Sequence, residues 1–110
     1  MYRIEYNRYM YDKPVYDILE TDTFKDWHKG ITDKKTHQVI AVRIRKMAYG
    51  NLGKTKSLKN GLYEAKIEYG AGFRLYFINK DKRIIVLLCG GDKSTQQADI
   101  INARKMAKEV

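Results

Sequence analysis

The fold is decided by three consecutive segments: Leu62-Tyr-Glu-Ala-Lys-Ile-Glu-Tyr69, Phe73-Arg-Leu-Tyr-Phe-Ile78 and Ile84-Ile-Val-Leu-Leu-Cys89. The first two alternate apolar and polar residues, which is the period of a strand with one buried face. The third is apolar throughout, as expected of a strand that is covered on both faces. We therefore predict three consecutive antiparallel strands, with the third one central in the sheet.

The segment Gly70-Ala-Gly72 predicts how the first two strands pair. A three-residue turn there places Tyr69 opposite Phe73 and Glu68 opposite Arg74, so that both apolar sets share one face. In this register Arg74 could have a purely structural role. That role is a cross-strand ion pair with Glu68, worth less than ~1 kcal/mol if exposed.

Capping residues mark three helices. Thr21-Asp-Thr23 predicts the start of a short helix, and Thr32-Asp33 predicts the start of a second helix that runs to about Tyr49. Ser94-Thr-Gln-Gln97 fits a capping box for a third helix at about 95–108.

The expected fold is a small α+β domain of order β-α-α-β-β-β-α. Its sheet is small and antiparallel, with about four strands, two N-terminal helices and a C-terminal helix. A short strand at 15–19 precedes the helices, and 50–61 is a polar connection. Residues 1–14 are expected to form an N-terminal arm and 15–110 one domain, since domains commonly have ~100–150 residues. The arm's four tyrosines, interleaved with basic residues, suit either base stacking or a partly ordered arm.

The composition is strongly basic, with 22 Lys and Arg against 13 Asp and Glu and a net charge of +9. This balance favours a polyanion or an acidic protein as partner. The single cysteine, Cys89, excludes an internal disulfide and indicates a reducing compartment. No apolar run approaches the ~18 residues of a membrane span, so we expect a cytoplasmic protein without a membrane partner.

Candidate metal ligands are scattered. His28, His37 and Cys89 fall on separate predicted elements, so neither a metal nor another cofactor is expected. Two histidines would allow an acid–base pair that cleaves RNA, although both are predicted on polar helix faces. The segment Gly50-Asn-Leu-Gly-Lys-Thr55 follows a helix and lacks the first-glycine spacing of a phosphate-binding loop, which excludes that motif.

The remaining candidate functional residues are cationic. The second helix leaves basic residues for solvent or for a partner, and further cations follow along the connection, the hairpin and the start of the last helix. Backbone N–H groups in that first helical turn favour a phosphate, and such a surface could stabilise a phosphoryl transition state without a metal. These cations are Lys35, Arg43, Arg45, Lys46, Lys54, Lys56, Lys59, Lys66, Arg74 and Lys93.

Three segments carry a family resemblance: Tyr63-Glu-Ala-Lys66, Gly72-Phe-Arg-Leu-Tyr76 and Val86-Leu-Leu-Cys-Gly-Gly-Asp-Lys-Ser-Thr-Gln96. They resemble the RelE/ParE toxin superfamily and, within it, the HigB-like "addiction module killer protein" group. The likeness covers about residues 15–108. It implies a toxin of a type II toxin–antitoxin pair, most of which are endoribonucleases that cut mRNA, often on the ribosome, without a metal.

The resemblance implies how such a site works. The RNA 2′-OH attacks its own phosphate, basic side chains stabilise the pentavalent state, and the leaving 5′-oxygen receives a proton. The family's arginine falls on Arg74, and its basic residues fall on Lys66 and Lys93, which are therefore the expected catalytic residues. The residues expected to bind RNA are Lys54, Lys56, Lys59, Asp92 and Ser94.

The general base is left open. A tyrosine or histidine that some relatives carry early in the last helix has no counterpart in Gln96-Gln-Ala-Asp99. Three carboxylates are candidates: Asp92, Glu64 and Glu68.

Two other functions fit the same residues. One is a ParE-like inhibitor of DNA gyrase without ribonuclease activity, and the other is a basic RNA- or ribosome-binding module without catalysis. For the toxin, the expected partners are mRNA, the ribosome and a cognate antitoxin. The resemblance suggests that this antitoxin is a helix-turn-helix protein encoded downstream.

Overall fold

A computed structural model describes residues 1–6 and 13–110 of the protein, and this part of the chain contains six strands and three α-helices. The strands are β1 (Tyr2–Ile4), β2 (Asp17–Glu20), β3 (Thr55–Ser57), β4 (Leu62–Ile67), β5 (Phe73–Lys80) and β6 (Ile84–Asp92). The helices are α1 (Asp22–Lys29), α2 (Lys34–Ala48) and α3 (Gln96–Glu109), and a short 3₁₀ turn, η1 (Lys93–Thr95), leads into α3.

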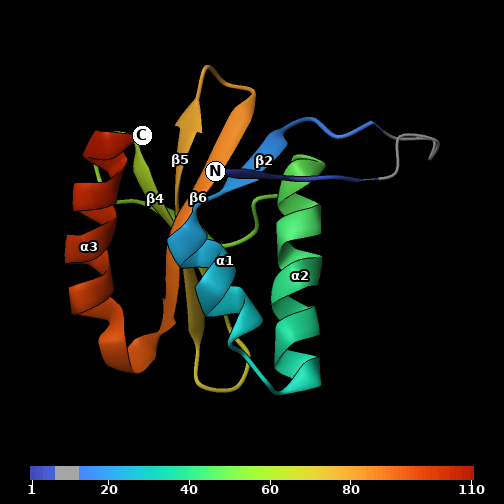
Figure 1. Cartoon of the computed structure of the whole chain (residues 1–110), viewed down its shortest axis with the longest axis vertical. Helices are drawn as coiled ribbons and strands as arrows, with labels where there is room; N and C mark the ends of the chain where they lie inside the picture. Colours follow the sequence, from blue (N-terminus) through green and yellow to red (C-terminus); the bar gives the residue numbers. More distant parts are fainter. Residues whose placement is uncertain (7–12) are drawn as a thin grey trace.

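The elements form three layers, with α1 and α2 on one face of the sheet and α3 on the other (Figure 1). The strand order is β1-β2-β6-β5-β4-β3. Every neighbouring pair is antiparallel except β2 and β6, which run parallel. None of the described helices has the length and apolar character needed to cross a bilayer.

The α+β class is confirmed, but the expected antiparallel sheet of about four strands is wrong. The sheet of the described residues has six strands and is mixed. The two missed strands, β1 and β3, have three residues each at the sheet edges, and their largely exposed side chains show no apolar alternation. The parallel pair was missed because it depends on residues far apart in sequence, Asp17–Glu20 and Ile84–Leu87.

The predicted register of β4 and β5 is wrong by two residues. Ile67 pairs with Phe73 and Lys66 with Arg74, because the reversal takes in Glu68 and Tyr69 as well as the two glycines. Tyr69 N–H donates to the Ile67 carbonyl within that reversal. An even shift keeps every side chain on its predicted face, so the apolar residues of both strands still face the same layer.

The helix starts are set by side chains that accept backbone N–H bonds. Thr21 caps α1 by accepting from Phe24 N–H, and Asp33 caps α2 by accepting from Thr36 N–H, at 3.0 Å in both cases. The predicted capping box at Ser94 is wrong. The side chain of Asp92 caps η1 by accepting from Ser94 N–H, and α3 begins at Gln96.

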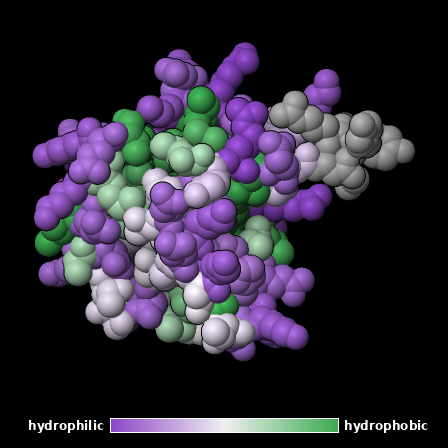
Figure 2. Space-filling view, viewed as in Figure 1, coloured by the Kyte–Doolittle hydropathy of each residue, from purple (hydrophilic) through white to green (hydrophobic). Residues whose placement is uncertain are grey.

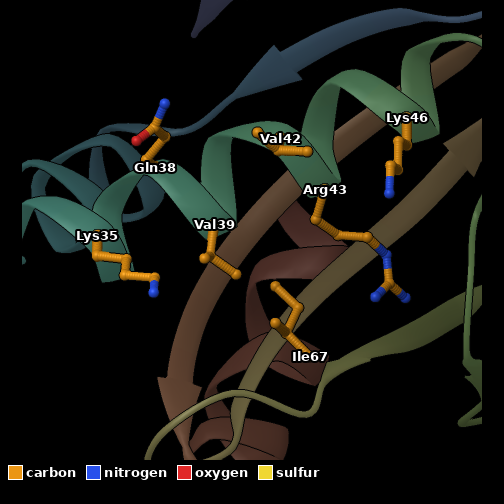
Figure 3. Close-up of a pocket in the computed structure, with 7 residues that line it drawn as sticks. All are labelled: Lys35, Gln38, Val39, Val42, Arg43, Lys46 and Ile67. Atoms are coloured by element: carbon orange, nitrogen blue, oxygen red, sulfur yellow. The ribbon is translucent and has the colours of Figure 1, made fainter.

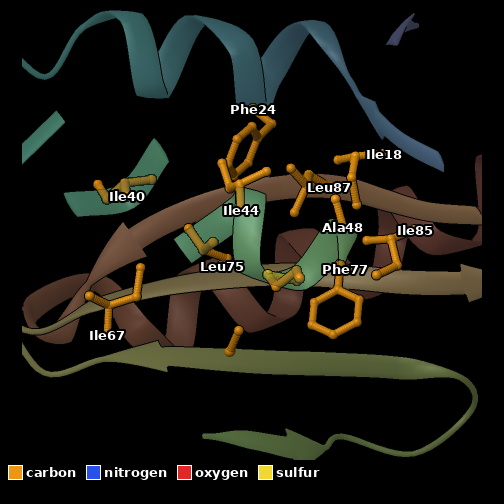
Figure 4. Close-up of a cluster of buried hydrophobic side chains, with 12 residues drawn as sticks. Ile18, Phe24, Ile40, Ile44, Ala48, Ile67, Leu75, Phe77, Ile85 and Leu87 are labelled. Carbon is orange, nitrogen blue, oxygen red and sulfur yellow. The ribbon is translucent and has the colours of Figure 1, made fainter. Parts of the chain in front are cut away.

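Strand β6 is central, as predicted, and its apolar residues are buried on both faces. One cluster of buried side chains joins the sheet to α1 and α2 (Figure 4). A second cluster joins the other face to Ala103 of α3 and includes Tyr76, Leu88 and Cys89. Polar side chains cover most of the face seen in Figure 2.

The predicted arm is described in part. Residues Tyr2–Ile4 form β1, which pairs with β2, and the Tyr6 ring packs edge-on against Tyr49 at 6.2 Å between centroids. Tyr9 and Tyr11 lie outside the described residues, so base stacking by the arm stays a prediction, as does the boundary at residue 14.

Gly90 and Gly91 at the end of β6 allow helices to approach the sheet closely from both sides. A Cβ on Gly90 would overlap the Trp27 ring of α1, and a Cβ on Gly91 would overlap the Asp99 carboxylate of α3. Two adjacent residues therefore fix where both helix layers meet β6.

Replacing Gly90 with alanine should lower the free energy of unfolding by ~1–3 kcal/mol, because the new methyl group would displace the Trp27 ring from its packed position. Urea denaturation followed by tryptophan fluorescence measures this change. The control is Gly30→Ala, at an ordinary helical backbone conformation, which should change the value by less than ~0.5 kcal/mol. Equal stability of the two variants would contradict the proposed contact.

Candidate functional site

The candidate site lies on the α3 side of the sheet, where the ends of β4, β5 and β6 meet. Lys66 pairs directly with Arg74, and Arg74 pairs with Gly91. Directly paired residues project to the same face, and Tyr76, two positions after Arg74, belongs to the cluster under α3. Lys66 and Arg74 therefore stand side by side on that face.

Lys93 is located at the same end of the sheet. A Cβ placed on Gly72 would lie 3.5 Å from Arg74 Nη1 and 3.8 Å from Lys93 Cβ, so both residues border this glycine. The side chain of Lys93 is exposed. The structure thus brings together the three predicted catalytic residues, Arg74, Lys66 and Lys93.

The Arg74 side chain is buried, with 5% of its surface exposed. Its Nη1 donates to the Gly72 carbonyl at 2.9 Å, whereas its buried Nε has no hydrogen-bond partner among the described residues. In the same part of the chain no carboxylate lies within 4.0 Å of the guanidinium. The expected ion pair with Glu68 is wrong, because Glu68 instead approaches Lys54 and Lys66, at 2.8 and 3.8 Å.

A buried guanidinium without a carboxylate is an unusual arrangement. An unpaired charge in a protein interior is strongly unfavourable, so it calls for an anion. The planar fork of N–H donors matches the oxygens of a phosphate. The chemistry that this site offers is therefore binding of a phosphate-like anion, with Lys66 and Lys93 adding positive charge beside it.

Two of the predicted RNA-binding lysines extend this cationic row to the edge of the sheet. The Lys54 carbonyl accepts from Lys66 N–H at 2.9 Å, and Lys56 on β3 pairs with Glu64 on β4. Lys54 just before β3, Lys66 on β4 and Arg74 on β5 thus follow one another across the sheet. The Lys54 ammonium also donates a hydrogen bond to Glu68 Oε1 at 2.8 Å. This hydrogen bond, together with the positive charges of Lys54 and Lys66, lowers the pKa of the Glu68 carboxyl.

The other predicted RNA-binding residues are arranged differently. Lys59 lies in the β3–β4 turn, at the opposite end of β4 from Lys66, with a positive φ of 74°. The structure does not bring it to the site. Asp92 and Ser94 flank Lys93, but their side chains bond to each other. These hydrogen bonds from Ser94 keep the pKa of Asp92 below its usual value.

One of the three candidate bases, Glu64, belongs to a polar cluster that adjoins Arg74, and its partners in that cluster, Gln96 and Tyr76, were not predicted from the sequence. Glu64 is buried, with 5% of its surface exposed, and its Oε2 accepts from Gln96 Nε2 at 3.0 Å. Tyr76 pairs with Glu64 across the strands, and its buried hydroxyl has no hydrogen-bond partner among the described residues. Burial, followed by the nearby charges of Glu64 and Asp99, raises the pKa of this hydroxyl. The feature of the sequence that could have indicated this cluster is Glu64, a carboxylate within an alternating strand.

Arg43 holds the connection that carries Lys54 in place. Its guanidinium donates to the carbonyls of Leu52, Lys54 and Lys66, at 2.9 to 3.2 Å. The expectation that Arg43 is left for solvent or for a partner is therefore wrong. The bonds to Lys54 and Lys66 couple α2 to the backbone of two residues in the cationic row.

The two histidines are together, but on the opposite side of the sheet. The His28 and His37 rings stack at 3.9 Å between centroids, and His28 Nε2 lies 3.1 Å from the His37 carbonyl oxygen. Burial lowers the pKa of His28. They belong to the α1 and α2 layer, so they are separated from Arg74 by the sheet. Among residues 1–6 and 13–110, His, Cys, Asp and Glu form no group of three suited to a metal.

A shallow groove also lies on that opposite side, between α2 and the end of β4, with a volume of about 360 Å³ (Figure 3). Val39, Val42 and Ile67 form its apolar part. Ile67 follows Lys66 in β4, and alternate residues of a strand face opposite ways, so this groove is not part of the Arg74 site.

Comparison with known proteins gives one informative relative. No family model matches the chain. An uncharacterized protein of Haemophilus influenzae is 39% identical over 93 residues, which cover 84% of this chain and 94% of that protein. The likeness therefore extends over most of both chains.

Arg43→Lys should lower the free energy of unfolding by ~1–3 kcal/mol, because lysine cannot reproduce the forked bonds to three carbonyls. Urea denaturation measures the change. The matched control is Arg45→Lys, two residues later on the exposed side of α2, with an expected effect below ~0.5 kcal/mol. Equal effects in both variants would show that the carbonyl contacts contribute nothing.

Inorganic phosphate should stabilise the protein more than chloride at the same ionic strength, because only an anion bound to the native state raises its melting temperature by mass action. Arg74→Met should remove this difference. Without phosphate, the variant should unfold at the same or a higher urea concentration, since the buried charge is gone. A variant that is less stable without phosphate and equally stabilised by it would contradict the assignment.

Proposed function

The chain belongs to the same protein family as the uncharacterized Haemophilus influenzae protein, and we propose that it is a toxin of a type II toxin–antitoxin pair that cleaves mRNA without a metal. The proposal includes the RelE-like, HigB-like architecture that the sequence motifs resemble. It also includes action in the cytoplasm, on mRNA held by the ribosome.

The single observation that carries the proposal is the Arg74 guanidinium. It is buried, it has no carboxylate within 4.0 Å among the described residues, and it lies beside Lys66 and next to Lys93. Three cations at the meeting point of three strands suit a phosphodiester that gains negative charge during reaction. Donors that are fixed before the reaction can stabilise such charge strongly, because they need no reorganisation in the transition state.

In the proposed reaction, the RNA 2′-OH loses its proton and attacks the adjacent phosphorus. The new P–O2′ bond forms as the P–O5′ bond breaks. A proton from solvent reaches O5′, which leaves a 2′,3′-cyclic phosphate and a free 5′-hydroxyl. Arg74 binds the non-bridging oxygens. Lys66 and Lys93 stabilise the extra charge of the pentavalent state.

Lys54 and Lys56 would bind the neighbouring phosphates where the RNA leaves the edge of the sheet. Both side chains are exposed on or beside β3. RNA binding through such contacts weakens steeply with salt, because each neutralised phosphate releases counterions. A cognate antitoxin, encoded downstream, would neutralise the toxin by covering this cationic face.

A second candidate is a ParE-like inhibitor of DNA gyrase. It is favoured by the first turn of α3, where Gln96 donates to Glu64 and Asp99 accepts from Thr95. These side chains form hydrogen bonds with other groups of the protein, and none of them is a histidine or tyrosine that could exchange protons with RNA. Intact mRNA together with DNA damage in cells that produce the protein would support this candidate.

Arg74→Ala should reduce mRNA cleavage by translating ribosomes by ~100-fold or more, which is the usual effect of removing a donor that stabilises the transition state. Mapping of mRNA ends and analysis of the terminal phosphates give the rate and the products. The wild-type products should carry 2′,3′-cyclic phosphates and should form in the presence of EDTA.

The matched control is Arg83→Ala, at the exposed β5–β6 hairpin, which should cleave like the wild type. Unchanged cleavage by Arg74→Ala would place the active site elsewhere. Absence of any cleavage by the wild-type protein, on ribosomes or on free RNA, would contradict the ribonuclease itself.

A further inference from the structure

Three carboxylates lie on or just after the two strands that pair with β5 beside Arg74, and each is a candidate to take a proton from RNA. Asp92 is the first, but its Oδ1 accepts from Ser94 N–H at 2.8 Å and also from the Ser94 hydroxyl. Glu68 is the second, and it is exposed and held at 2.8 Å by Lys54. A carboxylate that caps a helical turn, or one that is neutralised by lysine in solvent, is poorly placed as a proton acceptor. Glu64 is the third.

Glu64 has the geometry of a fixed acceptor. It precedes Lys66 by two residues on β4, so both side chains face the α3 side, as does Arg74 opposite Lys66. Gln96 of α3 donates to Oε2 at 3.0 Å. That contact orients the carboxylate through a residue 32 positions away in the chain, and the Tyr76 hydroxyl on the neighbouring strand lies near the same carboxylate.

The side chains around Glu64 include three cations and a hydroxyl group. Lys56 faces it from β3, Lys66 from β4, and Tyr76 with Arg74 from β5. From α3, Gln96 contacts Glu64 and Asp99 lies close to Tyr76. The raised pKa of Tyr76 means that its hydroxyl keeps its proton at neutral pH, so it can act as a donor but not as the base.

We infer that Glu64 is the general base of the site and takes the proton of the RNA 2′-OH with its carboxylate. This inference rests on the proposed ribonuclease and names one further catalytic residue in it. The O–H bond of the ribose breaks as the new O–H bond to Glu64 forms, and the freed electron pair of O2′ attacks phosphorus. The proton on Glu64 returns to solvent after the product leaves.

The test is Glu64→Gln, an isosteric change that can still accept a hydrogen bond from Gln96 but cannot take a proton. The variant should lower kcat for RNA cleavage by ~100-fold or more, the usual contribution of a general base. Its affinity for a non-cleavable RNA, with 2′-deoxyribose at the scissile position, should not change. Its circular dichroism and melting temperature report whether the fold is intact.

The matched control is Glu109→Gln, an exposed carboxylate at the end of α3, which should keep the wild-type kcat. A second variant, Gln96→Met, removes the hydrogen bond to Glu64 from a partly exposed helix residue. It should lower kcat by a smaller factor than Glu64→Gln, without changing the affinity for the deoxy-substituted RNA.

These outcomes distinguish failure of the base assignment from failure of the proposed ribonuclease. If the wild type cleaves RNA and Glu64→Gln cleaves at the same rate, the base assignment is overturned while the ribonuclease stands. If Glu64→Gln fails to fold, an unchanged kcat in Gln96→Met overturns the assignment, and a reduced kcat with intact RNA binding supports it. If the wild type cleaves no RNA, both proposals fall together.

Discussion

A buried positive charge with no carboxylate within 4.0 Å among the described residues is the constraint on which the site depends. The Arg74 guanidinium lies under the start of α3, with its own backbone turn as its hydrogen-bond acceptor. Folding alone would favour an apolar side chain at this position, because an unpaired buried charge opposes stability. Such an arrangement is expected where selection has favoured the binding of an anion over the stability of the free protein.

The sheet supplies the geometry that makes this charge useful. Strands β4, β5 and β6 bring Lys66, Arg74 and Gly91 into one row, and the absence of a side chain at Gly91 lets α3 descend onto the same row. Arg43 ties the neighbouring backbone to α2 from the other face. The cations are therefore held by main-chain ladders on a rigid scaffold, which suits recognition of a bent phosphodiester.

The sequence predicted what depends on local pattern and missed what depends on distant contacts. The alternation of β4 and β5 correctly placed Lys66 and Arg74 on one face of the sheet, although the predicted register was wrong by two residues. A shift by an even number of residues leaves each side chain on the same face. The edge strands β1 and β3 are too short and polar to show a period. The contact between Gln96 and Glu64 joins α3 to β4, so no local pattern could have revealed it.

The proposed function depends above all on one contact, between the Arg74 guanidinium and an RNA phosphate. A crystal structure of the protein with a short RNA, blocked by 2′-deoxyribose at the scissile position, would show whether that contact forms. We expect the scissile phosphate within hydrogen-bonding distance of Arg74, between Lys66 and Lys93. Density for the RNA across α2, on the opposite face of the sheet, with the Arg74 guanidinium unchanged and still without an anion, would contradict it.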